Sequence, residues 1–165
     1  MNPPERTEEA AGEIVTRKIP KGVSESKGSC VSVQPIPPKK SISDAEILVV
    51  GGRGLQKESD LDMIRELASL LGGDWATTRP LVEKGWNTND RQIGLSGRTV
   101  RPRLIITCGV SGAIQFTACM NGSDHIVAIN TDKNAPIFDV AHVAIVGDLY
   151  EIVPALIRQL KEGQA

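Results

Sequence analysis

The stretch Gly109-Val110-Ser111-Gly112 directly follows an apolar run at residues 103–108 and precedes a segment with helix-like composition. Glycines let the backbone approach a ligand closely, and a helix start presents free N–H groups and the positive end of its dipole. Such a turn suits a phosphate or diphosphate group. The motif is weak by itself, because Ser111 would equally serve as a plain N-cap of the following helix.

The same turn is close to the GxSxG nucleophile elbow of serine hydrolases, but its second glycine comes one residue early. A hydrolase also needs a base near the serine. His125 begins one expected strand and His142 precedes another, so neither histidine is well placed. The sequence therefore disfavours a serine hydrolase.

Two arginines directly follow expected strands: Arg53 in GGRGL, and Arg79 between Thr78 and a proline. Two cations beside a helix start suit a diphosphate or an electron-rich ring system, although each arginine taken alone fits an ordinary surface charge. Asp148 follows the last expected strand and has two interpretations. It accepts hydrogen bonds from ribose hydroxyls, or it caps the final helix.

The segment at residues 87–102 is polar and shows no helical periodicity. A long polar loop inside a compact domain is usually functional. We expect Gln92, Gly94 and Ser96 to lie along the edge of a ligand. The alternative is an exposed turn around Ser96 and Gly97.

From Ala45 onward, strand patterns alternate with helix patterns. We expect strands at residues 46–50, 74–78, 103–108, 125–130 and 142–147, and helices at residues 59–71, 111–120 and 148–163. Strands that are apolar on both faces indicate a mainly parallel sheet covered by helices on both sides. The expected fold is a Rossmann-like, three-layer α/β sandwich, in which ligands bind outside the carboxyl ends of the strands where the strand order switches.

Residues 1–44 differ from the remainder of the chain. They contain six of the ten prolines, and alternation at residues 13–19 and 29–36 suggests two short extended segments. Nothing in this region would bury a core. We interpret residues 1–44 as a linker or the end of a preceding element, and residues 45–165 as the ligand-binding domain.

Composition excludes several classes of function. A net charge of −1 and a pI near 6.1 give no electrostatic reason to expect nucleic acid or an acidic membrane. The three cysteines form no CxxC pair, which disfavours metal and disulfide frameworks and favours a reducing, cytoplasmic location. The apolar runs are too short to span a bilayer. No paired carboxylates or activated nucleophile indicate a substrate-transforming active site.

From about Asp44 to Glu162 the sequence resembles the C-terminal domain of the electron transfer flavoprotein alpha subunit. The resemblance lies in GGRGL, the Thr-Arg-Pro segment, WNTNDRQIGLSGRTVRPRLIITCGVSGAIQFTACM, the AIN at residues 128–130, NAPIF and VGDLYEIVPAL. It implies the fold shared with deoxyhypusine synthase, bound FAD, and a heterodimer with a beta subunit. Electrons would come from an acyl-CoA-type or other dehydrogenase and pass to a quinone oxidoreductase. Family members carry a further N-terminal domain, of which this sequence resembles only the end.

The resemblance also implies a set of cofactor-binding residues. They are Arg53, Thr78, Arg79, Gln92, Gly94, Ser96, Gly109, Ser111, Gly112, Ala113, Gln115, Phe116, Asn130 and Asp148. Arg79, with Thr78 nearby, is implied against the isoalloxazine ring. Ser96 replaces a threonine whose hydroxyl meets the central nitrogen of the ring. The glycine turn is implied beside the ribityl-diphosphate chain, and Asn130 and Asp148 beside the ADP half.

Three positions depart from the family pattern: Phe116 replaces the usual histidine, Leu95 a glutamine and Cys119 a glycine. The histidine normally donates a hydrogen bond to the pyrimidine carbonyl of the flavin and supports negative charge on the reduced ring. Phenylalanine has no donor. Losing a contact worth about 1.5–3 kcal/mol lowers the reduction potential by an amount on the order of 100 mV, if only the reduced form benefits.

Two main hypotheses for function remain at this point. The first is an FAD-binding electron-transfer protein, which is a carrier and not an enzyme. The second is a non-redox module that keeps the diphosphate site and binds AMP, ADP or NAD. An NAD-dependent enzyme of the deoxyhypusine synthase type ranks below both, because the sequence has no catalytic lysine motif. A gene fragment without activity of its own is the remaining alternative.

Overall fold

The computed structural model describes residues 15–18, 28, 30–34 and 41–163. The chain divides into two units, residues 1–38 and 39–165. In the first unit the described residues have no regular secondary structure, and the rest of the extended segments expected at residues 13–19 and 29–36 lies outside the described residues. The domain boundary expected after residue 44 stays a prediction.

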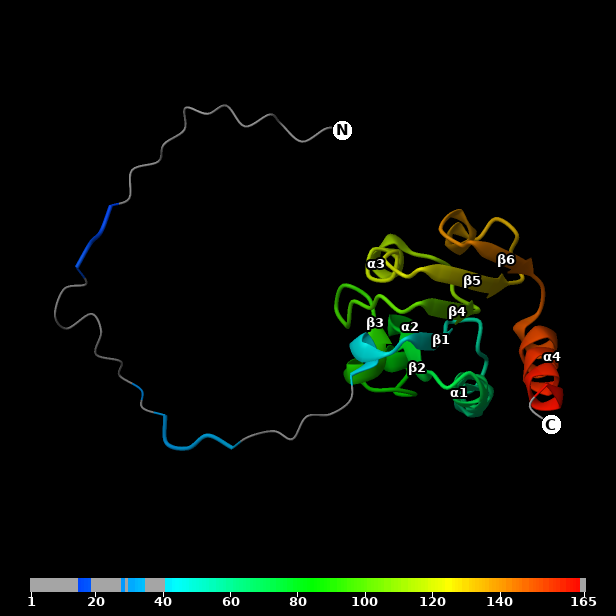
Figure 1. Cartoon of the computed structure of the whole chain (residues 1–165), viewed down its shortest axis with the longest axis horizontal. Coiled ribbons are helices and arrows are strands. Elements are labelled where there is room, and N and C mark those ends of the chain that lie inside the picture. Colours follow the sequence, from blue (N-terminus) through cyan, green and yellow to red (C-terminus); the bar gives the residue numbers. More distant parts are fainter. Residues whose placement is uncertain (1–14, 19–27, 29, 35–40, 164–165) are drawn as a thin grey trace, which may run out of the picture. The chain divides into compact units, whose positions relative to one another are not determined.

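The second unit is built on a six-stranded sheet (Figure 1). Its strands are β1 (Ile47–Gly51), β2 (Asp74–Thr78), β3 (Gln92–Ile93), β4 (Leu104–Cys108), β5 (His125–Asn130) and β6 (Val143–Val146). The strand order is β3-β2-β1-β4-β5-β6, and every neighbouring pair is parallel. The chain therefore moves outward from β1 to β3, then returns past β1 to form the other half. This order places the topological switch point between β1 and β4.

Helices cover both faces of the sheet, which confirms the expected three-layer sandwich. One face carries α1 (Leu61–Leu70), α2 (Arg79–Glu83) and α4 (Leu149–Glu162). The other carries the 3-10 helices η1 (Ile42–Asp44) and η4 (Pro136–Asp139) together with α3 (Ile114–Thr117). In Figure 1, α1 and α4 lie together on one side of the sheet. Each face has its own apolar cluster, so alternating strand residues are buried in both directions.

The expected strands agree with the structure to within one residue at each end, and α4 agrees equally well. The helix expected from residue 59 begins as the 3-10 helix η2 (Glu58–Asp60) and becomes α1 at Leu61. In the described part of the chain, five elements were not expected: η1, α2, η3 (Asn89–Arg91), β3 and η4. The polar segment at residues 87–102 contains the 3-10 helix η3 and strand β3, which pairs with the end of β2.

The helix expected at residues 111–120 is wrong: α3 spans only Ile114–Thr117. Gly112 has φ +89°, and Ala113 is the N-cap with ψ 143°, so the chain enters the helical region three residues later than the composition suggested. Ser111 is consequently not an N-cap. A four-residue helix also has too few aligned peptides for a substantial dipole, and the turn itself must provide any anion-binding groups.

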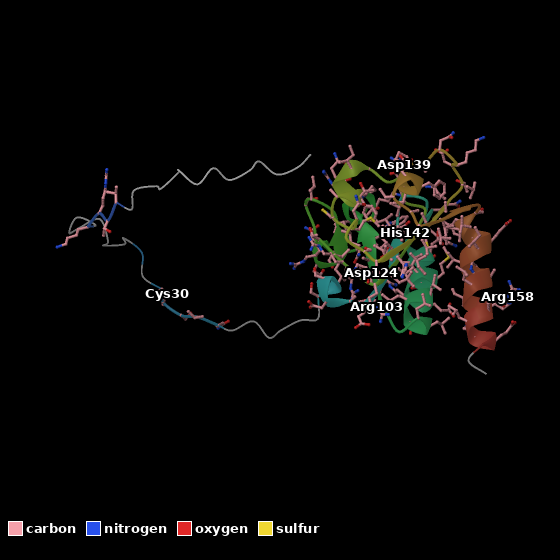
Figure 2. All side chains as sticks on the ribbon, turned by 45° about the horizontal axis from the view of Figure 1, so that its top comes forward. Cys30, Arg103, Asp124, Asp139, His142 and Arg158 are labelled. Atoms are coloured by element: carbon pink, nitrogen blue, oxygen red, sulfur yellow. The ribbon has the colours of Figure 1, made fainter. Side chains whose placement is uncertain are left out.

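A second set of polar side chains lies at the amino ends of the strands, opposite to the carboxyl ends. These are Arg103, Asp124 and His142, which directly precede β4, β5 and β6 and are labelled in Figure 2. Arg103 approaches Glu46 at 3.8 Å, and Nδ1 of His142 accepts a hydrogen bond from the N–H of Ile126 at 2.9 Å. These contacts join the amino ends of neighbouring strands. Ligands bind at the carboxyl ends, so these residues lie at the other end of the sheet.

Candidate functional site

The loops that follow β1 and β4 pack backbone against backbone at the switch point. The N–H of Gly52 donates to the carbonyl of Cys108, and the N–H of Gly54 donates to the carbonyl of Gly109, both at 2.9 Å. A Cβ atom on Gly52 would lie 2.4 Å from the carbonyl oxygen of Gly109. Gly109 itself has φ +65°, a conformation that favours glycine. Glycines at these positions therefore set the distance between the two loops.

Two pockets open at this edge of the sheet, on either side of the switch point. The β2–β3 pocket has a volume of about 520 Å³ and is lined by Arg53, Thr78, Arg79, Pro80, Gln92, Ile93, Gly94, Leu95, Ser96, Val110, Ser111, Ala113, Gln115 and Phe116. The β5–β6 pocket has a volume of about 400 Å³ and is lined by Arg53, Gly54, Gln56, Gly109, Ser111, Asn130, Thr131, Asp132, Ala135, Pro136, Gly147, Asp148, Leu149 and Tyr150. Arg53 and Ser111 line both, so the two pockets adjoin.

The structure thus brings thirteen of the fourteen expected site residues to one edge of the sheet. Gly112 is the exception, because it lines neither pocket. A Cβ atom there would lie 2.1 Å from the nitrogen of Ile137, whose N–H donates to the carbonyl of Ser111 at 3.1 Å. Gly112 therefore shapes the turn by close packing against η4. That these residues bind a cofactor stays a prediction.

The junction between the pockets combines one cation with open backbone donors. Within the described part of the chain, Arg53 has no ion pair or hydrogen-bonded side-chain partner, whereas Nε of Arg79 contacts Oε1 of Glu83 at 2.8 Å. In the same described part, the N–H groups of Ser111, Gly112 and Ala113 have no acceptor. A guanidinium beside consecutive free N–H groups suits an anion such as a diphosphate.

In the β2–β3 pocket, a buried glutamine positions a hydroxyl. Gln92 is 2% exposed, and its Nε2 donates to Oγ of Ser96 at 2.9 Å. The carbonyl of Gln92 also accepts the N–H of Arg98 at 2.7 Å, which closes a tight turn around Gly97. A Cβ on Gly97 would lie 2.3 Å from that same carbonyl oxygen. The turn therefore holds Ser96 at the pocket wall.

Two apolar residues, Leu95 and Phe116, line this pocket beside the polar Gln115 of α3. Phe116 is 5% exposed and packs in the core cluster with Cys119 and Met120. The side chain of Leu95 is 71% exposed, while its N–H donates to the carbonyl of Gln115 at 3.0 Å. Neither Leu95 nor Phe116 offers a hydrogen-bonding group to a ligand.

Two expected ligand residues of the β5–β6 pocket already serve the fold. Nδ2 of Asn130 donates to the carbonyl of Val110 at 2.8 Å, and its Oδ1 accepts the N–H of Asp132 at 3.0 Å. Asp148 is the N-cap of α4 and accepts the N–H of Tyr150 at 2.9 Å. Of the two interpretations of Asp148, the capping role is confirmed, and the contact with ribose stays a prediction.

The sequence interpretation missed Tyr150, Gln56 and the segment around Pro136, all of which line the β5–β6 pocket. Tyr150 lies in the first turn of α4, four residues after β6 ends at Val146, so extending the strand-end rule by one helical turn would have found it. Burial, and after it the hydrogen bond to the Asp60 carboxylate, raises the pKa of the Tyr150 hydroxyl. The phenol is therefore neutral at physiological pH.

These features fit a flavin dinucleotide. A dinucleotide needs room for a ring system at one end, room for a nucleoside at the other, and positive charge with N–H donors between them. The two adjoining pockets supply both ends, and Arg53 with the open N–H groups of the β4 loop lies between them. Among the described residues, no group of three or more metal-ligating side chains is present, and no helix is long and apolar enough to cross a membrane.

Comparison with known proteins agrees with this geometry. Residues 41–121 match the family model described as the electron transfer flavoprotein FAD-binding domain. The chain is 46% identical over 160 residues to the protein FixB of Azorhizobium caulinodans, an alignment that covers 94% of this chain and 43% of FixB. It is 52% identical over 120 residues to the electron transfer flavoprotein subunit alpha of Clostridium acetobutylicum, covering 73% of this chain and 36% of that subunit.

A third relative is the LctC subunit of the lactate dehydrogenase (NAD(+),ferredoxin) of Acetobacterium woodii. It is 47% identical over 161 residues, which cover 96% of this chain and 38% of LctC. The chain spans less than half the length of these curated relatives. The resemblance found in the sequence is confirmed, FAD is the cofactor of the matched domain, and the non-redox alternative is not favoured. The chain belongs to the electron transfer flavoprotein alpha family, of which it carries the FAD-binding domain.

Proposed function

We propose that this chain is the FAD-binding part of an electron carrier that accepts electrons from a dehydrogenase and passes them to an acceptor. The observation that supports the proposal is the pair of adjoining pockets at the switch point, joined by Arg53 and Ser111. FAD, when bound, would supply reversible one- and two-electron carriage.

The β2–β3 pocket is the proposed site of the flavin ring. Its apolar residues Leu95 and Phe116 would shield one edge of the ring from water, and Thr78, which is 7% exposed, lines the same pocket. Arg79 is exposed, and among the described residues its guanidinium pairs with the carboxylate of Glu83, which is exposed as well. That guanidinium is therefore available to approach a ring that gains negative charge on reduction. Ser96, held by Gln92, presents a hydroxyl to the same ring.

The β5–β6 pocket is the proposed site of the ADP half. Arg53 and the amides of the β4 loop would hold the diphosphate by charge-assisted and backbone hydrogen bonds. Asp148 has one carboxylate oxygen committed to the cap of α4, which leaves the second oxygen for a ribose hydroxyl. Asn130 acts on this half by holding the β4 loop against β5, because both of its polar groups are already used by the fold.

The partners belong to the same proposal. A beta subunit completes a heterodimer, and the transient partners are an acyl-CoA-type or other dehydrogenase and a quinone oxidoreductase. The family membership supports the beta subunit. We also propose a cytoplasmic location and a role as carrier without substrate chemistry of its own. The location rests on three cysteines without a CxxC pair.

An absorption spectrum tests the proposal. The protein is purified without added cofactor, incubated with FAD and desalted, and the same is done with an Arg53→Ala variant as control. We expect the bands of oxidised flavin to survive desalting in the wild type and to weaken in the variant. A wild type that stays colourless but is stabilised thermally by ADP or AMP would contradict electron carriage. That result would favour the alternative hypothesis of a non-redox nucleotide-binding module. The same measurement with a beta subunit present shows whether the pocket needs that partner.

A further inference from the structure

The hydroxyl of Tyr150 connects two elements that are far apart in sequence. It donates to Oδ2 of Asp60 at 2.5 Å and accepts a hydrogen bond from the N–H of Gln56 at 2.8 Å. Tyr150 belongs to α4, while Asp60 and Gln56 belong to the segment between β1 and α1. The phenol therefore fastens the start of the last helix to the loop that follows the first strand.

Asp60 reinforces this connection from the loop side. Its Oδ2 also accepts the N–H of Gln56 at 3.1 Å and the N–H of Lys57 at 3.0 Å, and the residue is only 8% exposed. Burial works against the carboxylate charge, but the hydrogen bonds that it accepts outweigh burial and lower the pKa of Asp60. We call this set of four hydrogen bonds the Tyr150–Asp60 latch.

Two residues of the latch, Gln56 and Tyr150, line the β5–β6 pocket. Arg53, Gly54 and Gln56 form one wall of that pocket, and residues 147–150 form another. The first wall belongs to the loop after β1, and the second contains the start of α4. Among the described residues, no hydrogen bond between backbone groups joins residues 53–56 directly to residues 147–150. The latch supplies that connection through the hydroxyl of Tyr150.

We propose that Tyr150 and Asp60 are positioning residues that hold the β5–β6 pocket at the width required by the nucleotide half of the ligand. The inference rests on the proposed function, because it takes that pocket as the ADP site. Its distinctive consequence is an asymmetry between the two pockets. Opening the latch weakens nucleotide binding and leaves flavin-ring binding unchanged, because no part of the latch lines the β2–β3 pocket.

The test uses Tyr150→Phe, which removes the hydroxyl and keeps the ring. ADP and riboflavin are titrated separately into the full chain by calorimetry, as probes of the two halves. We expect the Kd for ADP to rise about 5- to 10-fold, as the loss of one or two hydrogen bonds implies, with the Kd for riboflavin unchanged. Ser123→Ala is the matched control. Its buried hydroxyl donates to the carbonyl of Met120 at 2.6 Å, and Ser123 lines neither pocket.

Each result of the titrations has a definite meaning. Unchanged ADP affinity in Tyr150→Phe, or equal losses for ADP and riboflavin, would overturn the latch. If the wild type binds riboflavin but ignores ADP, the nucleotide half of the proposed function is wrong, and the inference falls with it. If the wild type binds neither probe, the proposed function itself fails.

A second measurement needs no variant and so remains decisive if Tyr150→Phe does not fold. Amide hydrogen exchange at Gln56 and Lys57 reports opening of the latch, because both N–H groups bond to it. We expect ADP to slow this exchange several-fold and riboflavin to leave it unchanged. Equal exchange rates with and without saturating ADP would contradict the inference.

Discussion

At the scale of single residues, the side chains at the site fall into two groups. In one group the polar atoms are already hydrogen-bonded within the protein, and in the other they are not. The side chains of Asn130 and Gln92 are hydrogen-bonded to neighbouring loops. They therefore act on a ligand indirectly, by positioning those loops. Arg53 has no such commitment within the described residues. Phe116 is a third kind, because it belongs to the core and to the pocket wall at once. Substitutions at these positions should therefore have different consequences for stability and for binding.

Phe116→His tests the tuning of the proposed flavin. Restoring a donor beside the ring should raise the one-electron reduction potential by about 60–130 mV, the equivalent of a 1.5–3 kcal/mol contact made only to the reduced form. The same change places an imidazole in an apolar cluster at a site that is 5% exposed, so the free energy of unfolding should fall by about 1–3 kcal/mol. A redox titration with FAD and a urea titration measure the two effects. An unchanged potential in a variant that binds FAD normally would show that residue 116 does not contact the ring.

At the scale of elements, the site depends on the loops after β1 and β4 more than on any helix. Their mutual distance is set by Gly52, Gly54 and Gly109, where added side-chain atoms would collide with the opposite backbone. The short α3 contributes through Phe116 and Gln115 and supplies no long dipole. Anion binding therefore depends on the geometry of two turns.

Gly52→Ala should separate these loops. The new Cβ would begin 2.4 Å from the carbonyl oxygen of Gly109, so we expect a loss of about 1–3 kcal/mol in stability from overpacking and at least a 10-fold loss in FAD affinity. Flavin fluorescence quenching measures the affinity. Gly73→Ala is the matched control, because its Cβ would begin 2.5 Å from the carbonyl oxygen of Ile47, at the other end of β1. Similar FAD affinities in the two folded variants would contradict the role assigned to the loops.

At the scale of the whole molecule, the sheet buries groups that titrate only when the chain unfolds. Cys108 ends β4 at the switch point and has no exposed surface. Burial raises the pKa of its thiol from 9.0 to about 12. Between these two pH values the unfolded chain loses the proton of Cys108 while the folded chain keeps it. Stability therefore falls as pH rises through this range, and the contribution of this group is fully present below it.

Comparing the wild type with Cys108→Ala isolates this effect. Between about pH 9 and 12, the free energy of unfolding of the wild type should fall more steeply, by up to about 1.4 kcal/mol per pH unit for one proton. Tyrosine and lysine groups titrate in both proteins and cancel in the difference. At neutral pH the variant should be less stable by about 1 kcal/mol because of the small cavity. Chemical denaturation across this pH range gives both values, and parallel curves above pH 9 would refute the assignment.

The sequence alone was enough to predict the layers of the fold and the edge of the sheet at which the two pockets lie. Val- and Ile-rich runs bounded by glycines predict parallel strands, and the residues after each strand must then meet at one edge. For the same reason the expected site residues from the loops after β1, β4 and β5 do line adjoining pockets. The family resemblance required only the order and spacing of those motifs.

Tertiary contacts decided what local composition could not. Residues 111–120 look helical, yet Gly112 packs within contact distance of Ile137, and this contact holds the backbone outside the helical region until Ile114. Strand β3 is two residues long and exists only because the end of β2 offers it a partner. The Tyr150–Asp60 contact joins residues 90 positions apart. No local pattern records such a pair, because propensity depends on near neighbours in the chain, whereas these contacts depend on which elements the sheet brings together.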